Sequence, residues 1–385
     1  MEKRKDVVLC VPTIRESCMR DFINRWESIG LFDHVDLIVM EDNPEPTFEL
    51  AGCFLASKPM PTQLVSFSMP SFLHLSWKDI ESDLGASSWI IPRRSDTVRS
   101  YAYFRAWKLG YKFIMTLDDD CYPTTREDGV VYDGEGFVAE HIKNLTGNIR
   151  WFSTLQTATP RGLPYNERGR LDTVWISHGL WTNVVDYDAP HQLANPVPEK
   201  FPFKTEIVPS NMYYPMCGMN VMWRAAATPL MYHLLMGNRI RYDRLSDDEP
   251  VMVDSYRLEK LPFDRFGDIW CGIFSKRILD LAQLNITSGL PYIRHERASN
   301  PFVNLRKEAN GLEVNEELWK HVDSFDQSNL PIARRGANFN CEFAAYAYGW
   351  LGQYMKRFDR FPEHAGYFDE LGEAMVVWSN LFKER

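Results

Sequence analysis

The sequence predicts an α/β fold built around a mixed, mainly parallel sheet of the Rossmann-like kind. Two observations predict this class. Apolar runs with the composition of buried strands alternate with amphipathic helical patterns along the first third of the chain. Polar and charged residues follow directly after several of these runs, and the carboxyl ends of parallel strands are where such sheets bind ligands.

The first strand is expected over residues 6–12, where the basic start of the chain gives way to an apolar run that ends at Pro12. This run is too short for a signal peptide. An amphipathic helix over 16–29 follows it, and a second strand over 35–40 ends in the turn 41–44.

A third strand is expected at 88–92, and a fourth over 111–117 leads into three aspartates. Between these two strands, Ser95 and Asp96 give the N-cap signal of a helix that Gly110 closes. The first half of the chain is therefore expected to repeat the strand–helix–strand unit of a parallel sheet.

We expect a catalytic α/β domain over residues 1–325 and a helical extension over 326–385. Two segments, 45–75 and 239–264, lack a clear period and are expected to be insertions. The extension is predicted from an aromatic amphipathic pattern over 341–358 and a second helical pattern after it.

Composition narrows the classes of partner. The 385 residues carry a formal net charge of −9, which argues against nucleic-acid binding and against an anionic membrane surface. No apolar run approaches the roughly 20 residues of a membrane span. The seven cysteines never occur in CxxC spacing, which indicates reduced thiols in a cytoplasmic protein and suggests no zinc site.

Three adjacent carboxylates, Asp118, Asp119 and Asp120, follow the fourth predicted strand. A strand that ends in Asp-x-Asp is a signature of nucleotide-sugar enzymes, in which Mn2+ or Mg2+ is bound by carboxylates and neutralises the diphosphate. Asp118 and Asp120 are the expected metal ligands, with Asp119 beside the substrate. The alternative is a solvated acidic turn, because the motif is short and matches by chance.

Further polar residues are expected at the same edge of the sheet: Pro12, Thr13 and Arg15 after the first strand, and Asp42 after the second. We expect Asp42 to accept the imide proton of uracil.

Asp96 and Arg99 lie at the start of a predicted helix near this edge. We expect Arg99 to reach the diphosphate, with Asp96 in the same binding site. The alternative is an ordinary i, i+3 surface pair.

Six segments resemble a known family. The first three are VPTIRE (11–16), DTVRS (96–100) and LDDDC (117–121). The resemblance is densest at SHGLWTNVVDYDAPHQL, PMCGMN and GLPYIRHERASNPFVNLRKE, which composition alone assigns to loops. Together they cover most of residues 6–310, in the right order, and resemble the reversibly glycosylated polypeptides, the UDP-arabinopyranose mutases. The resemblance implies a GT-A-type fold, a UDP-sugar substrate, a divalent metal and transient glycosylation of an arginine.

The resemblance also assigns roles to single residues. Two arginines seven apart precede the Ser-His-Gly-Leu-Trp segment of the family, and Arg161 and Arg168 have this spacing. Arg161 would take the sugar and Arg168 would support it. The family has two aspartates where this chain has Gly267 and Asp268, so one carboxylate is lost.

A carboxylate must accept a proton as arginine attacks, because a free guanidinium stays protonated. Asp268 is the expected base, with Asp186 and Asp188 as alternatives. His178 and Asp188 are expected at the substrate, and His295 is expected as a third metal ligand, since GT-A enzymes often draw one from a late loop. Each histidine could instead be a satisfied structural residue.

These features predict a mutase that interconverts pyranose and furanose forms of a UDP-sugar through a glycosyl-arginine. One rival is a metal-dependent glycosyltransferase or self-glycosylating protein on the same scaffold. Another is a non-catalytic UDP-sugar-binding subunit, which the loss of a carboxylate at Gly267 favours. The protein could act alone or within a homo- or hetero-oligomer.

Overall fold

The computed structural model describes residues 5–50, 72–146, 161–162, 164–165, 174–194, 203–242, 256–297, 299–326, 328 and 339–383. Within them a nine-stranded sheet has the order β3-β2-β1-β4-β8-β6-β11-β5, and β7 also pairs with β11. The strands of this sheet are β1 (Val7–Thr13), β2 (Val35–Glu41), β3 (Phe72–Leu75), β4 (Phe113–Leu117), β5 (Cys121–Pro123), β6 (Val174–Asn183), β7 (Glu206–Ile207), β8 (Asn220–Arg224) and β11 (Asn285–His295).

Most strands of this described sheet run in one direction. The four strands from β3 to β4 are parallel, and β8 is antiparallel to both β4 and β6. As a result β6, and β11 parallel to it, point the same way as β1, whereas β5 and β7 run against β11. The predicted α/β class with a mixed, mainly parallel sheet is therefore confirmed.

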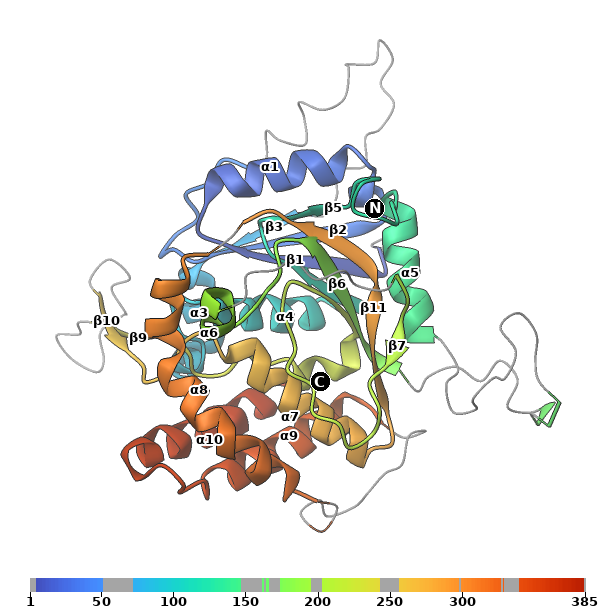
Figure 1. Ribbon diagram of the computed structural model, residues 1–385. Coiled ribbons are helices and arrows are strands. Elements are labelled where there is room, and N and C mark those ends of the chain that lie inside the picture. The colour runs from blue at the N-terminus through green and yellow to red at the C-terminus, as the bar shows by residue number, and fades with distance from the viewer. Residues whose placement is uncertain are drawn as a thin grey trace.

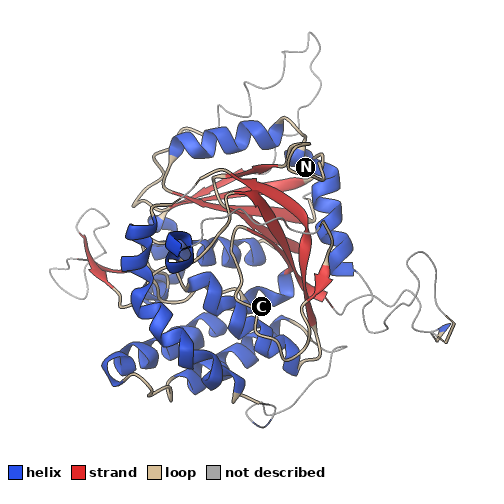
Figure 2. Ribbon diagram, in the orientation of Figure 1, coloured by secondary structure: helices blue, strands red, loops and turns tan. Residues whose placement is uncertain are grey.

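Helices cover both faces of the sheet (Figures 1 and 2). One face carries α1 and α5, and the other carries most of the remaining helices. The helices are α1 (Glu16–Glu27), α3 (Trp77–Leu84), α4 (Arg99–Lys108), α5 (Gly134–Thr146), α6 (Ala189–Ala194), α7 (Gly267–Leu281), α8 (Pro301–Asp323), α9 (Cys341–Met355) and α10 (Ala365–Asn380), with 3-10 turns η1 (Leu31–Asp33), η2 (Gly85–Ile90), η3 (Asp96–Val98), η5 (Ala225–Leu230) and η8 (Pro362–His364).

The alternation of side chains along β1 separates two hydrophobic cores. Leu9 and Val11 pack with Phe22 and Trp26 of α1 on one face. Cys10 packs on the other face, in a core that also includes α4, α7 and the C-terminal helices. A strand that is buried on both faces is continuously apolar, which is why the sequence of β1 shows no polar alternation.

The C-terminal helices close this second core. Tyr367 of α10 donates a hydrogen bond to the carbonyl of Leu235 at 2.8 Å, and the indole of Trp378 donates to the carbonyl of Pro229 at 2.9 Å. The helices predicted within the extension are confirmed. The expected boundary between residues 325 and 326 stays a prediction.

The structure corrects three expectations about local structure. The run 88–92 is not a strand, because its first part forms η2, and the third parallel strand is β3, within the segment expected to be an insertion. Two strands, β6 and β11, occupy stretches whose composition suggested loops. A separate antiparallel pair, β9 (Asn238–Tyr242) and β10 (Tyr256–Lys260), flanks part of the segment 239–264.

No helix in the described part of the chain is long and apolar enough to cross a membrane.

Candidate active site at the carboxyl edge of the sheet

Acidic side chains from five separate segments meet at the carboxyl edge of the sheet. They come from the ends of β2, β4 and β6, from η3 just before α4, and from the first turn of α7. The start of β8 lies at the same edge because β8 runs antiparallel to β4 and β6. Parallel topology therefore gathers residues that are far apart in the sequence.

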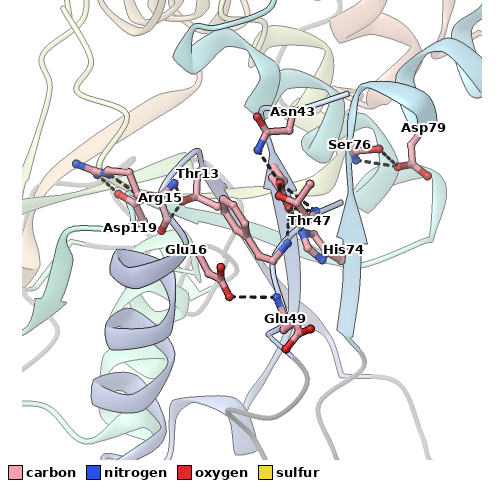
Figure 3. A network of polar contacts seen from close by, with 12 residues as sticks. Thr13, Arg15, Glu16, Asn43, Thr47, Glu49, His74, Ser76, Asp79 and Asp119 are labelled. Carbon is pink, nitrogen blue, oxygen red and sulfur yellow. Dashed lines mark hydrogen bonds and ion pairs between the residues drawn. The ribbon is translucent and has the colours of Figure 1, made fainter. Parts of the chain in front are cut away.

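The middle aspartate of the triplet is tied to β1. Asp119 is 3% exposed, and its Oδ2 accepts hydrogen bonds from Thr13 Oγ1 at 2.6 Å and from Arg15 Nε at 3.2 Å (Figure 3). Burial raises the pKa of Asp119. Burial also acts to lower the pKa of Arg15, but Asp119 and Asp120 outweigh it and raise that pKa. Thr13, Arg15 and Asp119 thus hold the end of β1 against the end of β4.

Asp120 and His295 form the part of the predicted metal site that fits a cation. His295 Nδ1 is 3.0 Å from the carbonyl oxygen of Val184, so it carries the proton, and Nε2 faces Asp120 Oδ1 at 3.8 Å. Two ligands of one Mn2+ or Mg2+ lie about 3 to 4 Å apart. Arg15 Nη2 donates to the other oxygen of Asp120 at 2.9 Å.

Asp118 contacts an arginine, and among the described residues no three acidic, histidine or cysteine side chains are grouped as a metal site. Arg99 Nη2 donates to Asp118 Oδ1 at 2.7 Å, Nη1 donates to the carbonyl of Gly218 at 2.9 Å, and Nε donates to that of Asp96 at 3.0 Å. Arg99 is 4% exposed. It therefore joins β4, α4 and the start of β8.

Asp96 is held ionised by a histidine that is 137 positions away in the sequence. His233 Nδ1 lies 3.4 Å from Asp96 Oδ2, and His233 is fully buried. Burial opposes the charge on Asp96, but His233, Arg99 and Arg265 outweigh it and lower the pKa of Asp96 to about 2. Burial lowers the pKa of His233.

Asp268 lies in the first turn of α7, and its pKa is shifted upward, opposite to that of Asp96. Its Oδ2 accepts a hydrogen bond from the backbone N–H of Gly218 at 2.9 Å, and its Oδ1 accepts from that of Ile269 at 2.9 Å. Burial and the nearby charges of Asp96 and Asp186 raise the pKa of Asp268 to about 7. At neutral pH this carboxyl group can therefore both accept and donate a proton.

The loop after β6 carries the two alternative acids. Asp186 is exposed, and it lies close enough to Asp118 and Arg265 for their charges to affect it, while desolvation by the surrounding protein raises its pKa. Asp188 is exposed, and its Oδ1 accepts a hydrogen bond from the backbone N–H of His191 at 2.8 Å, which caps α6. The structure thus brings Asp186, and not Asp188, into the acidic cluster.

Glu308 of α8 fixes this loop. Its Oε2 accepts a hydrogen bond from the backbone N–H of Ala189 at 2.7 Å, and its Oε1 accepts from Arg265 Nε at 2.8 Å. Glu308 is 4% exposed. One buried carboxylate therefore sets the positions of the loop that carries Asp186 and of the arginine that faces it.

Asp42 follows β2 and is 5% exposed. Its Oδ1 accepts hydrogen bonds from the indole of Trp77 at 2.7 Å and from the backbone N–H of Arg94 at 3.0 Å. Burial raises the pKa of Asp42. The preceding Glu41 is fully buried, and it accepts from Asn43 and Thr47 beside His74 (Figure 3).

His178 belongs to the interior of the sheet. It is 4% exposed, its Nδ1 is 3.1 Å from Ser288 Oγ, and burial lowers its pKa to about 3. Near it, His141 lies 2.9 Å from Ser177 Oγ through Nδ1 and 3.0 Å from Asn220 Oδ1 through Nε2. Pro12, another predicted contact to substrate, is half-buried near the end of β1.

A steric contact accompanies the glycine at 267. A Cβ atom there would lie 2.6 Å from the carbonyl oxygen of His233 and 3.4 Å from Thr97 Cγ2. No larger residue fits unless the backbone around His233 moves. Glycine replaces the aspartate of the family pattern at a position that packs against His233, the residue that contacts Asp96.

The two predicted arginines cannot be assigned to the cluster by contact. Arg161 is exposed and forms no hydrogen bond or ion pair with the described residues, and Gly162 beside it has a positive φ of 99°. Arg168 lies outside the described residues. Their roles stay predictions.

Comparison with known families identifies the group to which this chain belongs. A family model described as reversibly glycosylated polypeptide matches residues 2–385. The chain belongs to the reversibly glycosylated polypeptide family. Among curated members, the probable UDP-arabinopyranose mutase 4 of Arabidopsis thaliana is 30% identical over 392 residues, covering 99% of this chain and 91% of that protein. The UDP-arabinopyranose mutase 2 of Arabidopsis thaliana is 32% identical, with 99% and 92% covered.

Solved structures of other proteins are more distant. The mannosyltransferase PcManGT from Pyrobaculum calidifontis, in complex with GDP-Man and Mn2+, is 10% identical with a TM-score of 0.39, over 100% of this chain and 89% of that one. A mycobacterial protein has a TM-score of 0.38 at 10% identity, over 86% and 78% of the two chains. The GT-A-type fold expected for the family agrees with the sheet described above.

Two residues of the cluster were missed by reasoning from the sequence. His233 and Glu308 lie in segments without a recognisable motif, and each meets its partner only through the fold. The only sequence signal was a charged or titratable residue close to an expected site segment, which is too common to select them.

Proposed function

We propose that this protein is a UDP-sugar mutase that interconverts the pyranose and furanose forms of the sugar through a transient glycosyl-arginine at Arg161. The observation that carries the proposal is full-length similarity to proteins named UDP-arabinopyranose mutases, in a chain that keeps a cluster of carboxylates at the carboxyl edge of its sheet. The nucleotide-sugar site is assigned to this edge.

The first step transfers the sugar from UDP to the protein. A terminal nitrogen of Arg161 attacks the anomeric carbon, the bond from that carbon to UDP breaks, and UDP leaves with the electron pair. The guanidinium loses one proton, which passes to Asp268. The pKa of about 7 at Asp268 supports this assignment, because half of the carboxyl groups are then ionised near neutral pH.

The second step changes the ring. The lone pair of the attached nitrogen expels the ring oxygen, which takes the proton back from Asp268. Another hydroxyl then closes on the anomeric carbon and returns a proton to Asp268. UDP attacks the same carbon, Arg161 leaves and is reprotonated, and no atom is gained or lost over the cycle.

A divalent cation is part of the proposal. Asp120 and His295 would hold Mn2+ or Mg2+, with Asp118 as the third ligand. When bound, the ion would neutralise the charge that develops on the departing diphosphate. Arg15 and Arg99 position these carboxylates from the protein side.

Intact-mass measurement after incubation with a UDP-sugar tests the covalent step. The native protein should gain the mass of one sugar, which should map to Arg161 and be removed by added UDP. Arg161→Lys should gain no such mass, because lysine lacks the planar, oriented guanidinium nitrogens. An adduct at another residue, or native interconversion by Arg161→Lys, would contradict the assignment.

The same experiment separates the rival functions. Chromatography of the nucleotide sugar should show a ring-contracted or ring-expanded product. An adduct without this product would indicate a self-glycosylating protein or a glycosyltransferase. UDP-sugar binding without an adduct would indicate a non-catalytic subunit.

Metal dependence is tested by calorimetry with and without a chelator. Asp120→Ala should abolish the metal-dependent part of UDP-sugar binding, since it removes the carboxylate that faces His295. Equal affinity of the native protein with and without chelator would refute the metal assignment.

A further inference from the structure

The arginines expected to meet the diphosphate already bind protein acceptors. Arg99 uses Nε, Nη1 and Nη2 for two carbonyls and Asp118, and Arg15 donates to Asp119 and Asp120. These bonds hold the scaffold and also neutralise its carboxylates. An anionic diphosphate brought to this edge therefore needs positive charge from a further group, in addition to any cation.

Arg265 lies at this edge and carries such a charge. Its Nε donates to Glu308 Oε1 at 2.8 Å, which orients the guanidinium from behind, and its side chain is 33% exposed. Burial acts to lower the pKa of Arg265, but Glu308 raises it, and Asp186 and Asp268 are close enough for their charges to raise it further. Asp186 is in turn close enough to Asp118 for that charge to affect its pKa.

The backbone at Arg265 adds a second observation. Its φ is +65°, in the left-handed region, which costs free energy for any residue with a Cβ atom. Glycine or asparagine would adopt this conformation more readily. An arginine that is kept in a strained conformation, with a buried carboxylate to orient it, is typical of a residue with a functional task.

We propose that Arg265 binds the diphosphate of the nucleotide sugar through its terminal nitrogens, and that Glu308 is the positioning residue that aims it. The inference rests on the proposed function, because it takes the substrate to be a UDP-sugar. Planar guanidinium groups form paired hydrogen bonds with phosphate oxygens, so one arginine can both neutralise and orient the diphosphate.

Uridine and UDP differ by the diphosphate alone, and together they test the assignment. Binding of each to the native protein, Arg265→Gln and Arg265→Lys should be measured by ligand-observed NMR and calorimetry in Mg2+ buffer. Arg265→Gln should bind UDP about 10- to 100-fold more weakly, and uridine as the native protein does. Arg265→Lys should lose less affinity for UDP than Arg265→Gln, since lysine keeps the positive charge but cannot form the paired hydrogen bonds.

Arg277 provides the matched control. It lies on α7, the helix that begins two residues after Arg265, and it donates to the carbonyls of Phe325 and Asp323. Arg277→Gln should bind UDP with native affinity. Glu308→Gln should weaken UDP binding less than Arg265→Gln, and thermal unfolding of each variant should show that it folds.

The outcomes separate this inference from the proposed function. If the native protein binds no UDP, the proposed function fails and the inference fails with it. If the native protein binds UDP, and Arg265→Gln binds UDP equally well or loses UDP and uridine affinity to the same extent, Arg265 does not bind the diphosphate.

Discussion

The protein has two clusters of polar side chains, one inside the sheet and one at its carboxyl edge. Inside the sheet, Asn144 donates to Ser177 Oγ at 3.1 Å and to the carbonyl of Leu290 at 2.7 Å, while Asn220 donates to the carbonyl of Pro291 at 2.9 Å. At the edge, Asp96 and Asp186 lie close enough to Asp268 for their charges to raise its pKa.

The two clusters differ in charge. His141, in the interior network, has its pKa lowered to about 4 by burial, so it is neutral and both its nitrogens have partners. At the edge, the pKa of Asp96 falls to about 2 while that of Asp268 rises to about 7. Neutral groups that satisfy one another stabilise a fold, whereas carboxyl groups with separated pKa values are suited to proton transfer.

The contrast changes how the densest sequence motifs are interpreted. Ser177 and Asn220 belong to the segments with the strongest resemblance to the family, and the structure uses them to join β6, β8, β11 and α5. Of the residues expected to react, Arg161 and Asp268 come from other segments, whereas Asp186 and His295 lie within the dense ones. The segments with the densest resemblance to the family therefore contain residues that stabilise the fold as well as residues of the candidate site.

Replacing Asp268 by Asn should produce the largest loss of activity, and it tests most directly whether the edge cluster, unlike the interior one, transfers protons. The rate of adduct formation should fall about 10³-fold, because asparagine cannot accept the arginine proton. The native rate should also fall as the pH decreases below about 7, where Asp268 becomes protonated. Single-turnover mass spectrometry across pH measures both.

The same variant should become more stable at high pH. The folded protein keeps the Asp268 proton up to about pH 7, whereas an unfolded chain releases it near pH 4. Ionisation of Asp268 therefore destabilises the fold as the pH rises through this window. Asp268→Asn should melt above the native protein at pH 8 and equally at pH 4, and a lower melting temperature at pH 8 would contradict the assigned shift.

Replacing Asn220 by Ala should mainly lower stability. The substitution leaves His141 and the carbonyls of Leu180 and Pro291 without their side-chain partner, at a cost of about 3 kcal/mol. Urea unfolding gives the free energy. UDP affinity at low temperature, per folded molecule, should stay near native, and a selective loss of UDP binding by a stable Asn220→Ala protein would place this residue in the site.

Gly267→Ala should affect both the stability of the fold and the charge state of the acidic cluster. The added Cβ would meet the carbonyl of His233 at 2.6 Å, so we expect a loss of about 1 to 3 kcal/mol as the segment moves. Movement of His233 should also raise the pKa of Asp96, which NMR titration of carboxyl groups can detect. Native stability together with a native titration curve would show that this contact is not rigid.

The smallest effect is expected at Asp188. Because its side chain caps α6, Asp188→Ser should keep the cap and most of the activity, while Asp188→Ala should lose up to about 1 kcal/mol of local stability. Hydrogen exchange at His191 reports the cap. Loss of adduct formation in Asp188→Ser would instead favour Asp188 as the catalytic base.

The sequence correctly predicted those strands that are buried and have a continuous apolar sequence. The strands at Val7–Thr13 and Phe113–Leu117 are continuous in hydrophobicity, and Ser95 caps the turn before α4 as expected, accepting from the N–H of Thr97 at 3.1 Å. The run 88–92 misled because a short apolar segment that is buried as a 3-10 turn has the composition of a strand. The polar residues of β6 suggested a loop, but they lie in a buried strand where side chains such as that of Ser177 bond to other buried polar groups.

The site was predicted only as far as topology and motif extend. The carboxyl edge, the triplet and Asp268 could be found in this way. The protein partners of Arg99, and the pairs His233–Asp96 and Arg265–Glu308, depend on loops whose paths no period encodes. The contact of Arg99 with Gly218 joins positions 119 apart, and the two pairs join positions 137 and 43 apart, so their formation is a property of the packed chain.

The anchoring of α10 has a consequence for the order of events during synthesis. Tyr367 and Trp378 bind the carbonyls of Leu235 and Pro229, which flank His233 on either side. A chain that emerges from the ribosome with its amino end first can form β1 to β4 early, but it lacks these two anchors until α10 has appeared. We expect the histidine that faces Asp96 to be among the last groups to settle, so that newly made chains become competent only once α10 has been synthesised and has packed.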